Sequence, residues 1–449
     1  MKLTATLRTA TLRTASLVLA LAPAALANGR FPATNQILTR PGRPSELALR
    51  TTFGLLRSSD AGATWDWVCE KAIGYSGTVD PPLAWHANGT IVAGLFDGLA
   101  LTSEDACAWS QDPAVGKQVV VDVSLAEPSG GRLDALTGSY DPASPPGQPA
   151  YVSAIWTSDG AGRAWTQTST RLPADVIVES FDRAAADSRR LYVTGESEAG
   201  GTRVGVFLRS DDGGQTWTRR AFPFDANGER SLFLAAIDPL RAERLYVRTG
   251  GADAGRVLVS DDAGESFRTI WSGAQPQGFA LSPDGARVWV GSFRDGLSRA
   301  QTSDFAFATV NRTPIACLHS AGTSLYACSL DAYGFAAARS DDGGATFVPL
   351  LTLAKIRGPR ACGGDAAANV CLAEWPVVKA TVGIEDPVDA GPLPVFDAGS
   401  ARTPDRPSTC GCEVAGRPET KNATEAELFA LASAALVARC RRRRARVSP

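Results

Sequence analysis

Short apolar segments alternate with polar, glycine-rich segments along most of this chain. Phe-Leu-Arg at 207–209 and Val-Leu-Val at 257–259 are typical, and each runs directly into a Ser-Asp turn sequence. Segments of this length, bounded by Gly, Asp and Ser, predict β-strands joined by tight turns. Because no helical periodicity of any length is visible between residues 30 and 376, the pattern predicts an all-β protein.

One of these turn sequences recurs. Ser-Asp-Asp-Gly-Gly-Gln-Thr-Trp at 210–217 returns with the same spacing at 58–65, 260–267 and 340–347. The shared positions are Ser58, Asp60, Gly62 and Trp65, then Ser210, Asp212, Gly214 and Trp217, then Ser260, Asp262, Gly264 and Phe267, and finally Ser340, Asp342, Gly344 and Phe347. The Asp and Ser side chains can bond turn backbone, the Gly can take a positive φ, and the aromatic ring anchors the next strand. We call this sequence the box, and expect its residues to be structural.

Three weaker copies of the box, at 103–109, 157–165 and 302–307, fill the gaps between the clear ones. A second hairpin turn, marked by Gly54, Gly98, Gly296 and Gly334, precedes several boxes. Each unit therefore comprises four strands. Repetition of such a unit at a period of roughly 40–50 residues indicates a propeller or solenoid, and seven units predict a seven-bladed β-propeller.

The box resembles the Asp-box, or BNR, repeat of sialidases, sortilin-type receptors and photosystem II assembly factors. This resemblance implies that the boxes lie on the turns between the third and fourth strands of each blade, on the face away from the ligand-binding or catalytic mouth. The mouth would then be lined by the turns between second and third strands and by the links between blades, including the Pro-rich loop at 139–149. Candidate residues there for binding protein or carbohydrate are Tyr75, Arg220, Phe222, Trp271, Arg294 and Tyr333.

The same resemblance raises glycoside hydrolysis as the alternative function. Sialidases carry an arginine triad, a Tyr–Glu pair and an acid/base Asp at the mouth, with Phe-Arg-Ile-Pro near the N-terminus. Here Gly-Arg-Phe-Pro at 29–32 shares the Arg and Pro, but we favour a structural role in which Arg30 pairs with a neighbouring blade as the chain closes the ring. Tyr192, Tyr246 and Tyr326 lie in apolar strands and are expected in the core.

A hydrolase with two catalytic carboxylates is also open, with Asp80, Asp97, Asp295 and Asp331 as candidate acids. Most of them lie in or near turn sequences, where Asp commonly bonds local backbone. The only histidines, His86 and His319, build neither a nucleophile nor a zinc site and are expected to be structural. The sequence therefore favours a non-enzymatic, monomeric binding scaffold without metal or cofactor.

The charge and the two ends of the chain indicate where the protein acts. A formal net charge of −2 gives no field for nucleic acid. Basic residues, an apolar run and Ala-Leu-Ala at 25–27 predict a secretory signal peptide over 1–27. Export favours disulfides, for which we expect Cys69–Cys107, Cys317–Cys328 and Cys362–Cys371.

The propeller is expected over 28–376, with its first strand at 36–39 paired near the Cys362–Cys371 region so that no sheet edge stays open. A linker rich in Pro, Asp and Gly follows over 377–409, then a tail over 410–449. The tail holds Cys410 and Cys412, an apolar stretch at 428–438 and an arginine cluster. This order resembles the C-terminal sorting tail of exported myxobacterial proteins, which implies the cell envelope or outer surface, or secretion. Its apolar stretch is shorter than a usual membrane span of about twenty residues, so membrane anchoring stays open.

Overall fold

The computed structural model describes residues 30–76, 79–145, 150–199, 201–224, 228–251, 253–364 and 366–384. The predicted signal peptide, most of the predicted linker and the tail with Cys410 and Cys412 lie outside these ranges. So does part of the loop at 139–149.

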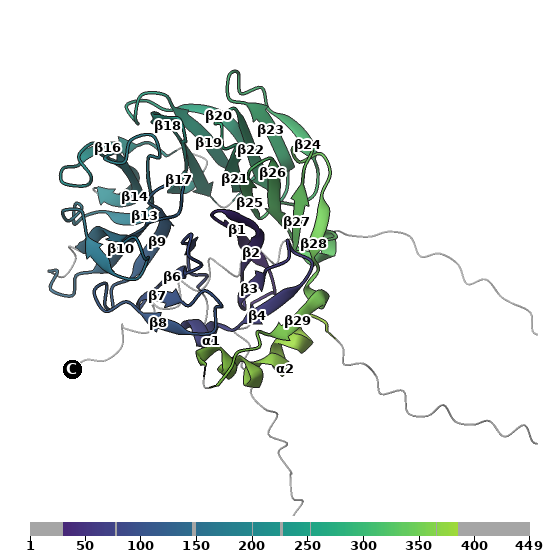
Figure 1. The fold of residues 1–449 in the computed structure, drawn as a ribbon. Coiled ribbons are helices and arrows are strands. Elements are labelled where there is room, and N and C mark those ends of the chain that lie inside the picture. The colour runs from purple at the N-terminus through teal and green to yellow at the C-terminus, as the bar shows by residue number, and fades with distance from the viewer. Residues whose placement is uncertain are drawn as a thin grey trace, which may run out of the picture.

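Seven sheets, each built on four consecutive antiparallel strands, stand around one axis, which confirms the seven-bladed propeller (Figure 1). Blade 1 comprises β1 (Thr34–Arg40), β2 (Arg43–Thr51), β3 (Gly54–Ser58) and β4 (Trp65–Val68), and blade 2 comprises β5 (Leu83–Trp85), β6 (Ile91–Leu95), β7 (Gly98–Thr102) and β8 (Trp109–Gln111). Blade 3 comprises β9 (Val120–Leu125), β10 (Leu133–Tyr140), β11 (Tyr151–Ser158) and β12 (Trp165–Gln167), and blade 4 comprises β13 (Ile177–Arg183), β14 (Leu191–Ala199), β15 (Thr202–Ser210) and β16 (Thr218–Phe222).

Blade 5 comprises β17 (Glu229–Asp238), β18 (Arg241–Gly251), β19 (Gly255–Ser260) and β20 (Arg268–Gly273). Blade 6 comprises β21 (Pro276–Leu281), β22 (Arg287–Ser292), β23 (Gly296–Gln301) and β24 (Ala308–Asn311). Blade 7 comprises β25 (Cys317–Ala321), β26 (Ser324–Cys328), β27 (Ala337–Ser340) and β28 (Val348–Leu351). The first strand of each blade lies nearest the axis and the fourth lies at the rim (Figure 1).

The box fixes the turn between the third and fourth strands through bonds that are local in sequence. In blade 1 the Ser58 hydroxyl donates to Asp60 Oδ1 at 2.8 Å and accepts from the Gly62 amide at 2.9 Å. The Thr64 amide and hydroxyl donate to the same carboxylate, at 2.9 and 2.6 Å. Asp212, Asp262 and Asp342 make the same set of bonds in blades 4, 5 and 7. The Asp carboxylates are thus fully used by their own turns, as a structural role requires.

The aromatic residue that closes the box in blade 1 packs into the core. Trp65 is buried, and its indole Nε1–H points to both the Gly62 carbonyl at 3.0 Å and the Leu350 carbonyl of blade 7 at 3.1 Å. Large apolar side chains packed between adjacent sheets form most of the remaining core. Tyr192 and Tyr246 are fully buried and Tyr326 nearly so, as the sequence predicted.

The ring closes differently from the prediction. The first strand, β1, pairs with β2 inside blade 1 and not with the Cys362–Cys371 region. Instead β29 (Ile356–Pro359) adds to the rim of blade 1 as a parallel neighbour of β4. The C-terminal part of the chain therefore covers the edge strand of blade 1, while each blade keeps four consecutive strands of its own.

Short helices, which the sequence pattern did not predict, lie beside blades 1 and 2. They are α1 (Glu70–Ile73) and α2 (Cys371–Thr381). Single 3₁₀ turns lie at Asp331–Tyr333 in blade 7 and, further along the chain, at Leu353–Lys355 and Ala367–Val370. Helix α2 has no distinct apolar stripe and contains Pro376, which normally argues against a helix interior. It also crosses residue 376, where we expected the linker to begin.

Two of the three predicted disulfide pairings are wrong. Cys317–Cys328 joins directly opposed residues of the β25–β26 hairpin, as predicted. Cys69 pairs with Cys371, and Cys107 pairs with Cys362, so these bonds join residues 302 and 255 positions apart. The spacing suggested local bonds, but the closed ring brings the C-terminal segment against blades 1 and 2. Three disulfides fit an extracellular protein.

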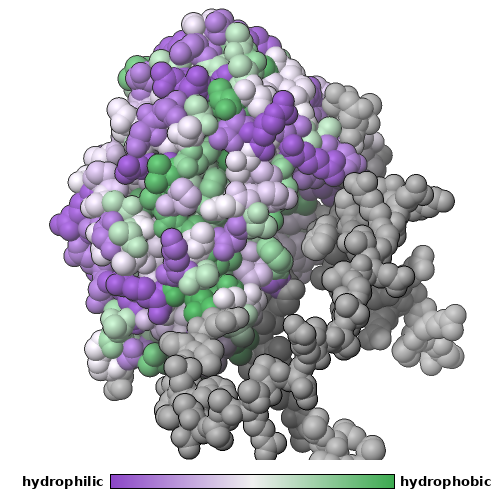
Figure 2. Space-filling model, turned by 90° about the vertical axis from the view of Figure 1, so that its right-hand side faces the viewer, coloured by the Kyte–Doolittle hydropathy of each residue, from purple (hydrophilic) through white to green (hydrophobic). Residues whose placement is uncertain are grey.

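One side of the molecule, on which the outer strands of blades 6 and 7 lie, is shown in Figure 2. Hydrophilic residues cover most of it, and hydrophobic residues gather in a broken central band. Among the described residues, no helix is long and apolar enough to cross a membrane.

Candidate functional site

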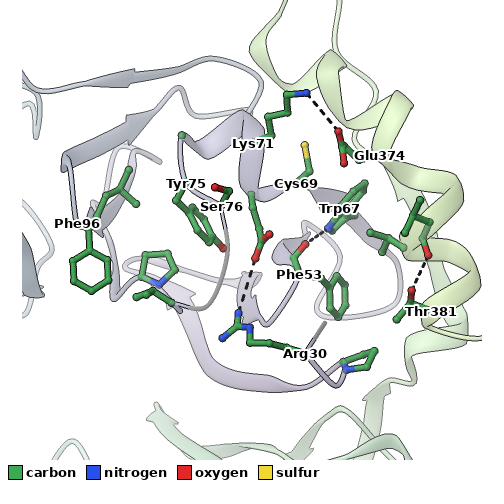
Figure 3. A pocket seen from close by; sticks show the side chains of 18 of the residues that line it. Arg30, Phe53, Trp67, Cys69, Lys71, Tyr75, Ser76, Phe96, Glu374 and Thr381 are labelled. Carbon is green, nitrogen blue, oxygen red and sulfur yellow. Dashed lines mark hydrogen bonds and ion pairs between the residues drawn. The ribbon is translucent and has the colours of Figure 1, made fainter. Parts of the chain in front are cut away.

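A cavity of about 830 Å³ opens where blade 1, blade 2 and α2 meet (Figure 3). Phe53 and Phe96 line it from the turns between the second and third strands of blades 1 and 2. Consecutive hairpin turns lie at opposite ends of a blade, so the cavity is on the face away from the boxes. The remaining walls come from α1 with the link behind it, and from α2.

The walls of the cavity are mainly apolar. Trp67 in β4 is almost fully buried, and its indole donates to the Phe53 carbonyl at 2.8 Å. Trp375 of α2 packs against it, with ring centroids 5.5 Å apart. At the opening, Phe96 is 63% and Val377 37% exposed. Exposed apolar residues around a concave apolar site are typical of a binding surface.

The charged side chains of the cavity are paired with one another. Arg30 donates to Asp80 at 2.5 Å and to the Thr52 carbonyl at 3.0 Å, and its guanidinium lies 3.9 Å from Glu70. At the opening, Lys71 lies 3.5 Å from Glu374 of α2. These contacts tie blade 1 to its neighbours, which is the structural role we considered for Arg30.

A tyrosine and a glutamate both line this cavity. No segment of the sequence was predicted to place a tyrosine beside a glutamate. Tyr75 and Glu70 belong to one turn, in which the Tyr75 amide donates to the Glu70 carbonyl at 3.1 Å. Burial raises the pKa of the Tyr75 hydroxyl far above its usual value, and the charges of Glu70 and Asp80 raise it further. The Tyr75 hydroxyl therefore stays protonated at neutral pH.

Residues 208–219 match the family model of the BNR/Asp-box repeat. This Asp box is the turn of blade 4, and its hydrogen bonds recur in three further blades, as described above. No curated protein matches the chain in sequence.

Several solved structures resemble this one in fold. An ancestral GH74 enzyme is 14% identical with a TM-score of 0.49, over 68% of this chain and 46% of its own. The GH74 enzyme of Niastella koreensis is 14% identical with a TM-score of 0.35, over 70% of this chain and 62% of its own. A nidogen/laminin complex chain is 12% identical with a TM-score of 0.37, over 58% of this chain and 91% of its own. The chain thus spans less than two thirds of both GH74 enzymes, and these likenesses extend to the propeller fold alone.

The six candidate binding residues do not form one site. Tyr75 lines the cavity. Arg294 and Tyr333 lie in mouth turns of blades 6 and 7, where Tyr333 packs edge-on against Phe293, with ring centroids 5.8 Å apart. Trp271 is half-buried on the outer strand β20.

Three of the six, Trp271, Arg220 and Phe222, lie on outer strands and not in the predicted mouth loops. Arg220, on the outer strand β16, forms an ion pair with Glu265 in the Asp box of blade 5. Phe222 is buried in the core between blades 4 and 5, where it packs against Phe267. The fourth strand of blade 4 extends to Phe222, further than the sequence pattern indicates.

The candidate acids have turn or linking roles. Asp80 accepts from Arg30 and Asn35. Asp295 accepts from the Ala274 amide at 2.7 Å, and Asp331 accepts from the Leu353 amide at 2.9 Å. Asp97 is exposed at the opening of the cavity. Asp80 directly precedes blade 2 and Asp97 lies in it, whereas Asp295 and Asp331 belong to blades 6 and 7.

Both histidines are structural, as predicted. His86 is buried, and its Nε2 lies 2.9 Å from the Gly131 carbonyl. His319 lies 2.9 Å from the Thr39 hydroxyl, and burial lowers the pKa of its imidazole to about 4. Within the described ranges, no group of three or more His, Cys, Asp or Glu residues is arranged to hold a metal ion.

Sequence reasoning missed the aromatic residues that build the cavity. A usable signal was present, because Phe53 and Phe96 stand just before the glycine of a mouth hairpin turn, in Phe-Gly and Phe-Asp-Gly. An aromatic residue at an exposed turn is unusual unless it packs on something. The contribution of α2 could not be predicted, since it comes from the opposite end of the chain.

Two half-buried carboxyl groups were also missed. Asp122 and Asp182 lie on β9 and β13, the innermost strands of adjacent blades. Burial raises the pKa of each to about 7, and the charge of Asp122 contributes to the shift of Asp182. Asp122 accepts from the Val123 amide at 2.9 Å and the Phe181 amide at 3.2 Å. Neither residue lines the cavity described above.

These two groups predict an unusual dependence of stability on pH. An unfolded Asp loses its proton near pH 4, whereas these keep theirs to about pH 7, so the free energy of unfolding should fall as pH rises between those values. Replacing both by Asn should raise stability at pH 7.5 by about 2 kcal/mol, reduced from the full effect because both side chains are partly accessible to water. Thermal unfolding from pH 4.5 to 8 measures this. An equal pH slope in wild type and D122N/D182N would contradict it.

Proposed function

We propose that this protein is a non-enzymatic, exported binding scaffold, and that the cavity between blades 1 and 2 and α2 is its ligand site. The proposal rests on one observation. The walls of the cavity are apolar, and its basic side chains already form ion pairs with neighbouring carboxylates. Trp67 and Phe53 offer apolar surface, while Arg30 and Lys71 are already engaged by neighbouring carboxylates. A site of this kind recognises apolar groups and offers few polar contacts to a sugar.

The ligand that fits best is a polypeptide segment with an aromatic or large aliphatic side chain. Such a side chain could enter between Trp67 and Tyr75, while Phe96 and Val377 at the opening contact its neighbours. Carbohydrate recognition needs several free hydrogen-bonding groups beside an aromatic ring. A glycan ligand and a glycoside hydrolase therefore remain the alternatives that the experiment must distinguish.

Localisation at the cell envelope or cell surface is part of this proposal. The predicted signal peptide and the three disulfides support export. The likeness of the tail to a sorting signal supports surface attachment. The Asp box also resembles that of sortilin-type receptors and photosystem II assembly factors. This resemblance supports a binding role in general but names no ligand.

The test is a selection of displayed random 12-residue peptides on the full-length protein, followed by affinity measurement with the tightest peptide, hereafter the probe peptide. We expect enrichment of aromatic and aliphatic residues. F96D or V377D should weaken the probe peptide at least tenfold, because each introduces a charge at the apolar opening. The matched control is L240D, since Leu240 is 68% exposed in a turn at the opposite, Asp-box end of blade 5.

The contradicting outcomes are equally definite. No enrichment, or affinities that F96D and V377D leave unchanged, would exclude this cavity as the peptide site. Specific binding on a glycan array would favour a carbohydrate ligand. Turnover of aryl glycosides would establish the hydrolase alternative, and loss of that turnover in D295N or D331N would place it at the candidate acids.

A further inference from the structure

The ring of this propeller is closed by a segment that also forms one wall of the cavity. We call β29, α2 and the chain between them, residues 356–384, the clasp. Ile356 and Pro359 pair with Trp65 and Trp67 of β4. The clasp then crosses toward blade 2 and returns, so that Glu374, Val377, Val378, Thr381 and Val382 line the cavity (Figure 3).

Two disulfides attach the clasp at its middle. Cys371 is the first residue of α2 and bonds Cys69, which itself lines the cavity. Cys362 bonds Cys107 in the Asp box of blade 2. The Cα atoms are 5.3 and 5.6 Å apart, as in ordinary disulfides. Both bonds fix the position of α2 relative to the opposite wall of the cavity.

Besides the disulfides, α2 is held by apolar packing. Trp375 and Val378 pack against the core of blade 1, and the Trp375 ring lies on Trp67. The Lys71–Glu374 ion pair is exposed and contributes little. Leu372 is 64% exposed, Pro376 interrupts the helical hydrogen bonds, and helices of this length are marginal by themselves. The position of α2 therefore depends on the disulfides.

We infer that the ligand site is completed only by oxidation of the clasp, so that the protein becomes able to bind after export. Each bond forms when two cysteine thiols transfer two electrons and two protons to a disulfide oxidant, such as an oxidised thiol-disulfide oxidoreductase, which becomes a dithiol. In a reducing compartment the thiols persist and the α2 wall is not held. The consequence for binding rests on the proposed function, whereas the opening of the wall does not.

Amide hydrogen exchange of the full-length protein tests the inference without a ligand. We expect C69S/C371S to accelerate exchange over residues 372–382 at least tenfold, while blades 3 to 6 exchange as in wild type. C107S/C362S should give a smaller increase. The matched control is C317S/C328S, which removes the disulfide within one hairpin of blade 7, only 11 positions apart, and should leave α2 unchanged.

Affinity for the probe peptide is the second readout, and should fall at least tenfold in C69S/C371S but not in C317S/C328S. Unchanged exchange of α2 in both clasp variants would overturn the inference, as would an equal increase in the control. If C69S/C371S does not fold, the clasp disulfides of the wild type can be reduced stepwise with a phosphine instead. The reagent can reach the Cys107–Cys362 bond because Cys362 is only half-buried. Opening of α2 must then coincide with the loss of one clasp disulfide. A wild type that binds no peptide would defeat the proposed function and leave the exchange result to decide the clasp.

Discussion

Replacing Asp134 by alanine is expected to destabilise the propeller by about 3–5 kcal/mol, the usual effect of leaving one member of a buried ion pair alone. Asp134 is fully buried in β10, and its two oxygens accept from Arg183 Nε at 2.6 Å and Nη2 at 3.1 Å. The Thr157 hydroxyl also donates to it, at 2.6 Å. The variant leaves the Arg183 charge between blades 3 and 4 without its partner.

The matched control is an ion pair of similar length on the surface. Arg219 lies 2.7 Å from Asp175, with side chains 38% and 58% exposed. D175A should therefore change stability by less than about 1 kcal/mol. Denaturant unfolding followed by circular dichroism compares the two, with a midpoint shift expected only for D134A. Equal effects would show that burial does not determine the strength of this pair.

Replacing Gly264 by alanine is expected to cost about 3 kcal/mol, from a positive φ and from overpacking together. Gly264, in the Asp box of blade 5, has φ +86°, and a Cβ atom there would overlap the ring of Phe207 from blade 4. That ring is buried against Tyr192 and Phe267 and has little room to move.

The control is Gly213, one position earlier in the Asp box of blade 4. Its φ is +76°, but nothing lies within 4 Å of a Cβ added there. Ala61 and Ala263 occupy the same box position with φ of 58° and 60°. G213A should therefore cost about 1 kcal/mol at most. Thermal unfolding of the two variants separates the cost of backbone strain, which both share, from the cost of steric overlap, which only G264A has. A similar loss of stability in both variants would refute the overlap with Phe207.

The sequence predicted the number of blades because the information needed was local. In the Asp box, the Ser210 and Thr216 hydroxyls both donate to Asp212 within one turn, so residue types at fixed spacing reveal the structure. The Cys317–Cys328 bond was predictable for the same reason, since a single hairpin opposes the two residues.

The rest of the site depends on contacts between distant parts of the chain. Cys69 meets Cys371 only because seven blades complete a ring and return the C-terminal segment to blade 1. Trp375 meets Trp67 for the same reason. Helix α2 could not be predicted from the sequence, because it contains Pro376 and has only a weak amphipathic pattern. The cavity could not be predicted, because it exists only once these elements meet.

The two faces of the propeller have different features. The Asp boxes stabilise one face and use their carboxylates internally. The opposite face carries the cavity, where Tyr75 is buried with a raised pKa and Arg30 is held by Asp80. The proposed binding function rests on these buried and paired groups.

The most direct measurement is the hydrogen-exchange footprint of the probe peptide on the full-length oxidised protein. The account predicts protection at residues 52–54, 69–76 and 374–382, which surround the cavity, with no turnover of aryl glycosides by the same preparation. Protection confined to the mouth turns at 293–295 and 331–335 would contradict the assignment of the site, and glycoside turnover would contradict the assignment of the function.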